Sequence, residues 1–130
     1  MKIAVGSDHG GFELKELIIS ALQDMGQEVE SVGCHSPESV DYPDLAEKVC
    51  ALVQDGSCER GILVCGTGLG MSIAANRHQA IRAALCHEAF TARMSREHNN
   101  ANVLCLGGRV IGPEIALDIL KTWVETEFAG

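Results

Sequence analysis

The segment Cys65-Gly66-Thr67-Gly68-Leu69-Gly70 places a thiol directly before glycines at alternate positions. Such glycines let the backbone turn its N–H groups inward, which makes a nest for a negatively charged oxygen. A dinucleotide-binding fingerprint would need a glycine at Met71, and a P-loop would need a Lys followed by Ser or Thr, so neither motif fits. A glycine loop alone is a weak signal. Beside a thiol, however, an oxyanion nest suits proton abstraction next to a carbonyl.

Three further segments carry polar side chains that suit an anionic substrate. Ser7–Gly11 puts Asp8 and His9 at the start of a helical pattern. For Asp8 alone an N-cap is the favoured interpretation, whereas for Asp8 and His9 together an anion site is the better one. Ser95–Asn102 contains His98 and three asparagines. For Asn100 and Asn102, solvated residues at a helix end are a better interpretation than site residues. Gly107-Gly108-Arg109 adds one guanidinium, for which a solvated surface position is an equally good interpretation.

These segments follow a regular alternation of strands and helices. Apolar runs predict strands at Lys2–Ser7, Glu28–Val32, Gly61–Cys65, Ile81–Leu85 and Val103–Leu106. Helical spacing predicts helices over about 14–25, 45–53 and 70–77, around Phe90 and Met94, and from Pro113 to about Phe128. Asp44 is the expected N-cap of the second helix, and Ala129-Gly130 the expected C-cap of the last.

The alternation indicates an α/β fold, a three-layer Rossmann-like domain with a five-stranded parallel sheet. Ligands bind such sheets beyond the carboxyl ends of the strands. We therefore expect the thiol, the nest, both histidines, Asp8 and Arg109 to gather at one edge of the sheet. Strand order does not follow from the sequence.

Composition narrows the class of protein. The chain of 130 residues is 46% hydrophobic, which fits a single domain over 1–130. A net charge of -8 argues against nucleic-acid binding, but local cations and N–H groups can still bind a small anion. No apolar run suits a membrane span or a signal peptide, and the six cysteines lack metal-site spacing. We expect no metal, reduced thiols and a cytoplasmic protein.

The motifs DHGG, DYP, CGTGLGMSIAAN, SREHNNANVL and GGR occur in this order between Met1 and Gly130. Together they resemble the B-type ribose-5-phosphate isomerases and their galactose-6-phosphate and allose-6-phosphate isomerase relatives. The resemblance implies interconversion of ribose 5-phosphate and ribulose 5-phosphate through a cis-enediolate, without metal or organic cofactor. Two alternatives remain open: an isomerase of a six-carbon sugar phosphate, and a non-catalytic phosphosugar-binding subunit.

The resemblance implies four catalytic residues. Cys65 is similar to the family's base, which moves a proton between C2 and C1 of the sugar. Thr67 and Asp8 would handle hydroxyl protons, and His98 would open the furanose ring. Some family members use a Glu as base at the position of Met71. A thioether cannot accept that proton, so the chain resembles the cysteine-using members.

The resemblance also implies the substrate-binding residues. The nest for the enediolate oxygen would be formed by Gly66, Gly68 and Gly70. Asn99 would bind the sugar, His9 and Arg109 would bind the phosphate, and Tyr42 would shape the pocket.

Family members are homodimers or homotetramers with shared active sites, in which the His98 region faces the thiol loop of another subunit. Their chains usually continue beyond the position of Gly130 into a basic tail with two phosphate-binding arginines. We therefore expect the functional protein to be longer than 130 residues, with at least two more arginines or lysines.

Overall fold

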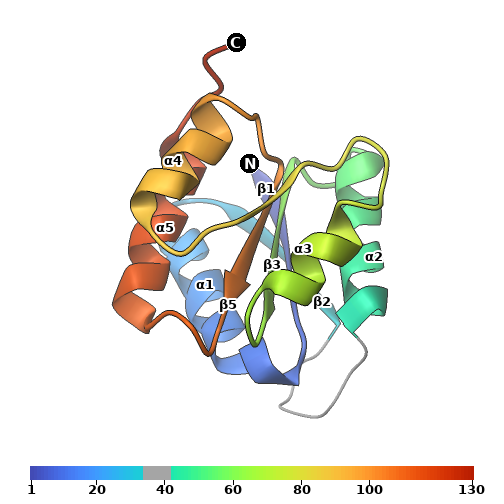
Figure 1. The fold of residues 1–130 in the computed structure, drawn as a ribbon, viewed down its shortest axis with the longest axis vertical. Coiled ribbons are helices and arrows are strands. Elements are labelled where there is room, and N and C mark those ends of the chain that lie inside the picture. The colour runs from blue at the N-terminus through green and yellow to red at the C-terminus, as the bar shows by residue number, and fades with distance from the viewer. Residues whose placement is uncertain (34–41) are drawn as a thin grey trace.

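A computed structural model describes residues 1–33 and 42–130, in which strands and helices alternate (Figure 1). The elements are β1 (Lys2–Ser7), α1 (Phe12–Asp24), β2 (Glu28–Gly33), α2 (Tyr42–Gln54), β3 (Arg60–Cys65), α3 (Leu69–Ala75), β4 (Ala83–Leu85), α4 (Ala89–Glu97), β5 (Val103–Gly107) and α5 (Pro113–Glu125). A short 3-10 turn, His9–Gly11, joins β1 to α1. No helix in this part of the chain is long and apolar enough to cross a bilayer.

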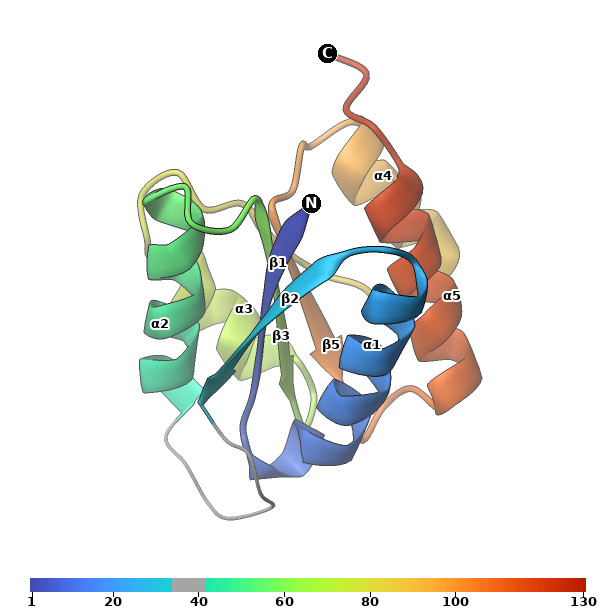
Figure 2. The same ribbon diagram turned by 180° about the vertical axis from the view of Figure 1, so that it is seen from behind.

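The five strands form one parallel sheet in the order β2-β1-β3-β5-β4, with β3 in the middle. Helices α1, α4 and α5 cover one face and α2 and α3 cover the other (Figures 1 and 2). The predicted three-layer α/β fold with a five-stranded parallel sheet is confirmed. The carboxyl ends of β1, β3 and β5 are neighbours, because these strands lie side by side.

The strands read as continuous apolar runs because both faces of the sheet are buried. In β3, Ile62 and Val64 point to the side of α1 and α5, whereas Leu63 and Cys65 point to the side of α2 and α3. The largest buried side chain is Trp123 of α5, which packs in the first of these clusters. Packing of the core on both faces thereby determines where each strand ends along the sheet.

Several predicted boundaries differ from the structure, among them the start of the fourth strand, the start of the second helix and the end of the last helix. The fourth strand begins at Ala83 rather than Ile81, because the backbone N–H of Arg82 donates to the Asn102 side chain at 2.8 Å instead of joining the sheet. The second helix begins at Tyr42, so Asp44 lies in its first turn and is not the N-cap.

The last helix ends at Glu125, and the predicted glycine cap at Ala129-Gly130 is therefore wrong. Thr126 ends α5 in an extended conformation, and its hydroxyl donates to the Thr122 carbonyl at 2.6 Å. Arg60 donates to the Trp123 carbonyl at 2.9 Å. Side-chain donors thus bind the last carbonyls of α5, which would otherwise accept hydrogen bonds from the backbone N–H groups of a glycine cap.

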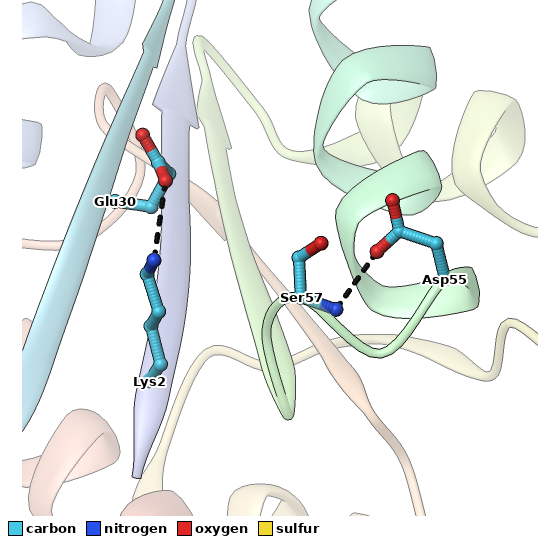
Figure 3. Close-up of polar contacts among 4 residues, drawn as sticks. All are labelled: Lys2, Glu30, Asp55 and Ser57. Atoms are coloured by element: carbon cyan, nitrogen blue, oxygen red, sulfur yellow. Dashed lines mark hydrogen bonds and ion pairs between the residues drawn. The ribbon is translucent and has the colours of Figure 1, made fainter.

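The amino edge of the sheet carries short-range polar contacts at the surface (Figure 3). Lys2 of β1 and Glu30 of β2 form an exposed ion pair at 3.5 Å. The Asp55 carboxylate accepts a hydrogen bond from the Ser57 N–H at 2.8 Å, and the hydrogen bonds with Ser57 lower the pKa of Asp55. An exposed ion pair stabilises a fold by at most about 1 kcal/mol, so these contacts shape turns more than they hold the sheet.

Candidate active site

Backbone hydrogen bonds join the loops that follow β1, β3 and β5. The Asp8 N–H donates to the Val64 carbonyl at 3.2 Å, and the Gly108 N–H donates to the Cys65 carbonyl at 2.8 Å. The Arg109 N–H donates to the Gly66 carbonyl at 2.9 Å. The three loops therefore form one continuous surface at the carboxyl edge of the sheet, with the end of β3 at its centre.

The Cys65 thiol lies at this edge, and its sulfur accepts a hydrogen bond from the Gly68 N–H at 3.1 Å. The residue is 6% exposed, so substrate could reach the sulfur only from the loop side. A hydrogen bond to sulfur is stronger when the sulfur is a thiolate, since charge-assisted hydrogen bonds exceed neutral ones. The loop therefore provides one feature that a thiolate base needs.

Cys50 and Cys86 differ from Cys65 in that their thiols donate hydrogen bonds to the main chain. The thiols of Cys50 and Cys86 donate to main-chain carbonyls, each at 4.0 Å. Burial raises the pKa of Cys50 to about 11 and also raises the pKa of Cys86, so both are thiols at neutral pH. Five cysteines are free, as predicted for reduced thiols, and Cys34 lies outside the described residues.

Glycines let the thiol loop pack against β5. Gly68 has a φ of +81°, and a methyl group on it would collide with the Leu85 side chain. A methyl group on Gly107 would lie 2.6 Å from the Thr67 carbonyl oxygen. Thr67 is exposed, and its hydroxyl accepts from the Leu69 N–H at 3.2 Å. Gly70 lies within the first turn of α3, next to this loop.

Asp8 caps the turn that follows β1. Its Oδ1 accepts a hydrogen bond from the Gly11 N–H at 3.1 Å, so the N-cap interpretation of this residue is confirmed. A methyl group on Gly11 would lie 2.6 Å from a Val64 methyl, which shows how closely the turn packs on β3. The Asp8 carboxylate is thereby held beside the thiol loop.

Two groups that can carry positive charge lie at the same edge. The exposed Arg109 side chain passes over the thiol loop, since a methyl group on Gly66 would lie 3.5 Å from its Cδ. A methyl group on Gly10 would lie 3.9 Å from its Nη2. His9 is exposed beside Gly10 and lines a cavity of about 340 Å³ between the turn and α5. The predicted anion-binding groups of β1 and β5 are thus adjacent.

His98 and Asn99 lie at the amino edge of the sheet, opposite to Cys65. The expectation that both histidines of one chain gather at the carboxyl edge is therefore wrong. His98 and Asn99 follow α4, which runs antiparallel to the strands and ends where β5 begins (Figure 1). The His98 imidazole is 62% exposed, and its Nε2 lies 3.8 Å from a carboxylate oxygen of Glu97. Tyr42 begins α2, and its side chain lies outside the description.

Asn100 is exposed, as predicted, and Asn102 is half-buried; the side chains of both also form hydrogen bonds within the chain. The Asn102 side chain accepts from the Arg82 N–H at 2.8 Å and donates to the Ala80 carbonyl at 2.9 Å. The Asn100 side chain accepts from the buried Arg96 guanidinium at 3.1 Å. Sequence analysis missed the role of Arg82, although it is the one charged residue in the apolar run Ile81–Leu85.

Comparison with known proteins identifies the family of the chain. The model of a family described as Ribose/Galactose Isomerase matches residues 3–130. A putative sugar phosphate isomerase from Bacillus subtilis, YwlF, is 48% identical over 100% of this chain and 88% of its own length. Ribose-5-phosphate isomerase B from Escherichia coli is 46% identical over 99% of this chain and 87% of its own.

A solved structure gives the same result for the fold. Ribose-5-phosphate isomerase B from Clostridium thermocellum is 57% identical and superposes with a TM-score of 0.98. The match covers 100% of this chain and 88% of that one.

Proposed function

The chain belongs to the ribose/galactose isomerase family, and on that premise we propose that it interconverts ribose 5-phosphate and ribulose 5-phosphate. The observation that carries the proposal is the Cys65 sulfur, which accepts a hydrogen bond from the Gly68 N–H at 3.1 Å in a loop over which the Arg109 side chain passes. A base next to an N–H loop and cations suits enolisation of a carbonyl compound that bears a phosphate.

In the proposed reaction, the Cys65 thiolate removes the proton from C2 of the open-chain aldose. The electron pair forms the C1–C2 double bond of a cis-enediolate, and the aldehyde oxygen becomes the anionic oxygen. N–H groups of the loop Gly66–Gly70 bind that oxygen. The thiol then returns a proton to C1, and Thr67 and Asp8 move the hydroxyl proton from O2 to O1. The Asp8 cap on Gly11 supports this role, because it fixes the carboxylate through one oxygen only.

The phosphate is proposed to bind near His9 and Arg109. Both side chains are exposed at the carboxyl edge, where an anion from the solvent can reach them. This cluster would concentrate positive charge locally in a chain with a net charge of -8.

His98 is proposed to open the furanose ring in the site of a second copy of the chain. Its position at the amino edge, away from Cys65, supports a shared site, because one copy does not bring the two residues together. Leu69 and Ile73, beside the thiol loop on α3, are 55% and 60% exposed. An apolar surface at the mouth of a site is a typical contact area for another subunit. We therefore propose a homodimer or a higher homo-oligomer.

A cytoplasmic location is part of the proposal. Its support is chemical: the five described cysteines are free, which suits a reducing compartment.

A six-carbon sugar phosphate is the second candidate substrate. The family description names galactose beside ribose, which favours keeping this alternative. One added carbon changes specificity by only roughly 1–3 kcal/mol, so small differences in the pocket decide between the sugars.

A substrate panel tests the proposal. We expect turnover of ribose 5-phosphate in a coupled assay that persists in excess EDTA, since the proposed steps use only side chains and backbone N–H groups. Comparison of kcat/KM for ribose 5-phosphate, allose 6-phosphate and galactose 6-phosphate identifies the preferred sugar. Calorimetric binding of all three without turnover of any would contradict an isomerase. Loss of activity on chelation, restored by a divalent metal, would contradict the proposed mechanism.

A further inference from the structure

The turn that carries His98 and Asn99 is held by hydrogen bonds that the proposed chemistry does not use. Arg82, which lies before β4, donates from Nε to the Asn99 carbonyl at 2.6 Å. The donor is charged, and hydrogen bonds from charged donors are stronger than neutral ones. This bond attaches the peptide between Asn99 and Asn100 to the residue that precedes β4.

Asn102 ties the same two segments together from the other side. Its side chain accepts from the Arg82 N–H at 2.8 Å and donates to the Ala80 carbonyl at 2.9 Å. The Asn102 N–H also donates to the Arg82 carbonyl at 3.0 Å. Backbone and side chain of Arg82 therefore contact both ends of the turn that follows α4.

Arg96 supports the turn from inside the protein. Its side chain is 5% exposed and donates to the Ala101 carbonyl at 2.6 Å, to the Asn100 side chain at 3.1 Å and to the Thr126 carbonyl at 3.2 Å. Asn100 has a φ of +50°, which reverses the chain after the helix. The buried Arg96 side chain thus fixes the turn, while His98 itself remains exposed.

We propose that Arg82 is a positioning residue for ring opening: it holds the Asn99 carbonyl, and with it the turn that carries His98, so that the imidazole reaches the sugar ring in a fixed orientation. The inference rests on the proposed function, in which His98 acts on the furanose. The turn itself has few apolar contacts to fix it, because His98, Asn99 and Asn100 are all exposed. A rigid support matters, since a misplacement of about 1 Å can cost about 100-fold in rate.

The test separates ring opening from proton transfer. Ribose 5-phosphate is a furanose that must open, whereas ribulose 5-phosphate is an open chain, because its C5 oxygen carries the phosphate. Deuterium exchange from D₂O into C1 of ribulose 5-phosphate, followed by NMR, therefore needs the base but not the ring-opening group. Turnover of ribose 5-phosphate needs both.

Arg82→Met removes the donor and keeps the length of the side chain. We expect it to lower turnover of ribose 5-phosphate by about 10- to 100-fold and to leave exchange at C1 of ribulose 5-phosphate close to wild type. Arg82→Lys, which keeps a donor, should recover part of the turnover. The matched control is Arg77→Met, because Arg77 is also exposed and its side chain donates to no residue within 1–33 or 42–130. It should keep wild-type turnover.

A double variant decides whether Arg82 acts through His98. Arg82→Met should add little to the loss caused by His98→Asn, because the group that it positions is already absent. A full additional loss in that background, or an equal loss of turnover and exchange in Arg82→Met alone, would overturn the proposal. So would a melting temperature far below wild type in both Arg82 variants. If the wild-type protein shows neither turnover nor exchange, the proposed function fails instead.

Discussion

At the residue scale, one thiol differs chemically from the others that the structure describes. The Cys65 sulfur accepts a hydrogen bond at a loop, whereas the Cys50 thiol donates its hydrogen bond to the buried Ala75 carbonyl. A base must accept a proton, so only the first arrangement is useful for enolisation. The same amino acid thus serves as a packing residue in the core and as the proposed base at the edge of the sheet.

Substitution of the base should separate proton transfer from binding. We expect Cys65→Ala to lower turnover by at least about 100-fold, the usual contribution of a general base, while ribose 5-phosphate still binds in calorimetry. Deuterium exchange at C1 of ribulose 5-phosphate should stop as well. Cys50→Ala is the control, since Cys50 is buried with a pKa of about 11 and should keep exchange. Exchange that continues in Cys65→Ala would remove this thiol from the mechanism.

At the element scale, close packing between a loop and a strand sets the geometry of the thiol. Gly68 has a φ of +81°, and a methyl group added to it would lie 3.0 Å from the Leu106 carbonyl carbon. Gly56 has the same φ of +81° with no neighbour within 4 Å. The chain therefore offers two glycines that share their backbone conformation and differ in their surroundings.

Alanine substitution at these two glycines should differ in cost. Gly56→Ala should lower the free energy of unfolding by about 1–2 kcal/mol, which is the strain of a left-handed residue with a side chain. Gly68→Ala should cost at least about 1 kcal/mol more, because its methyl group also overpacks the site. It should also lower turnover, whereas Gly56→Ala should not. Urea unfolding and the coupled assay measure both effects, and equal costs would contradict the packing argument.

Helix α4 has a cap whose contribution depends on pH. The Glu88 carboxylate accepts from the Thr91 N–H at 3.0 Å, and the hydrogen bonds with Thr91 lower the pKa of Glu88 below its ordinary 4.5. A lowered pKa stabilises the folded state above pH 4.5, and this stabilisation is lost as the pH falls through the lower, folded-state value. Glu88→Ala should therefore lower the melting temperature at pH 7, and the difference from wild type should shrink in acid. A constant difference across the titration would contradict this origin.

The sequence predicts most elements because apolar periodicity is a local property. The first strand, Lys2–Ser7, has the predicted bounds, and the glycine loop follows β3 as expected. Asn102 could not be assigned in this way, because its hydrogen-bond partners lie about 20 residues earlier in the chain. The edge on which His98 lies follows from topology rather than from its own motif, since a helix after a parallel strand ends at the amino edge.

At the scale of the whole molecule, the proposed base and the proposed ring-opening group lie at opposite edges of the sheet. The proposed joint action of Cys65 and His98 on one substrate therefore requires a second copy of the chain. A complete site would need the carboxyl edge of one copy and the amino edge of another. Such an arrangement predicts complementation between two different inactive variants.

Mixing Cys65→Ala with His98→Asn should restore activity. In a dimer with two shared sites, each heterodimer has one site that carries both substitutions and one site that is intact. Random exchange of subunits after reversible unfolding should therefore recover about a quarter of the wild-type turnover. Each variant alone, treated in the same way, serves as the control. No recovery in a mixture that contains heterodimers would place both residues in the same copy.

The order of the strands in the sheet also governs when the site can form during synthesis. β3 pairs with β1 and β5 through residues far apart in the chain, such as Ile3 with Arg60 and Gly61 with Val103. A nascent chain that ends before β5 has made Cys65 but lacks Gly108 and Arg109, which close over it. Contacts of such separation form slowly. Enzymatic activity should therefore be a late signal in folding, and it should report completion of the sheet rather than formation of its helices.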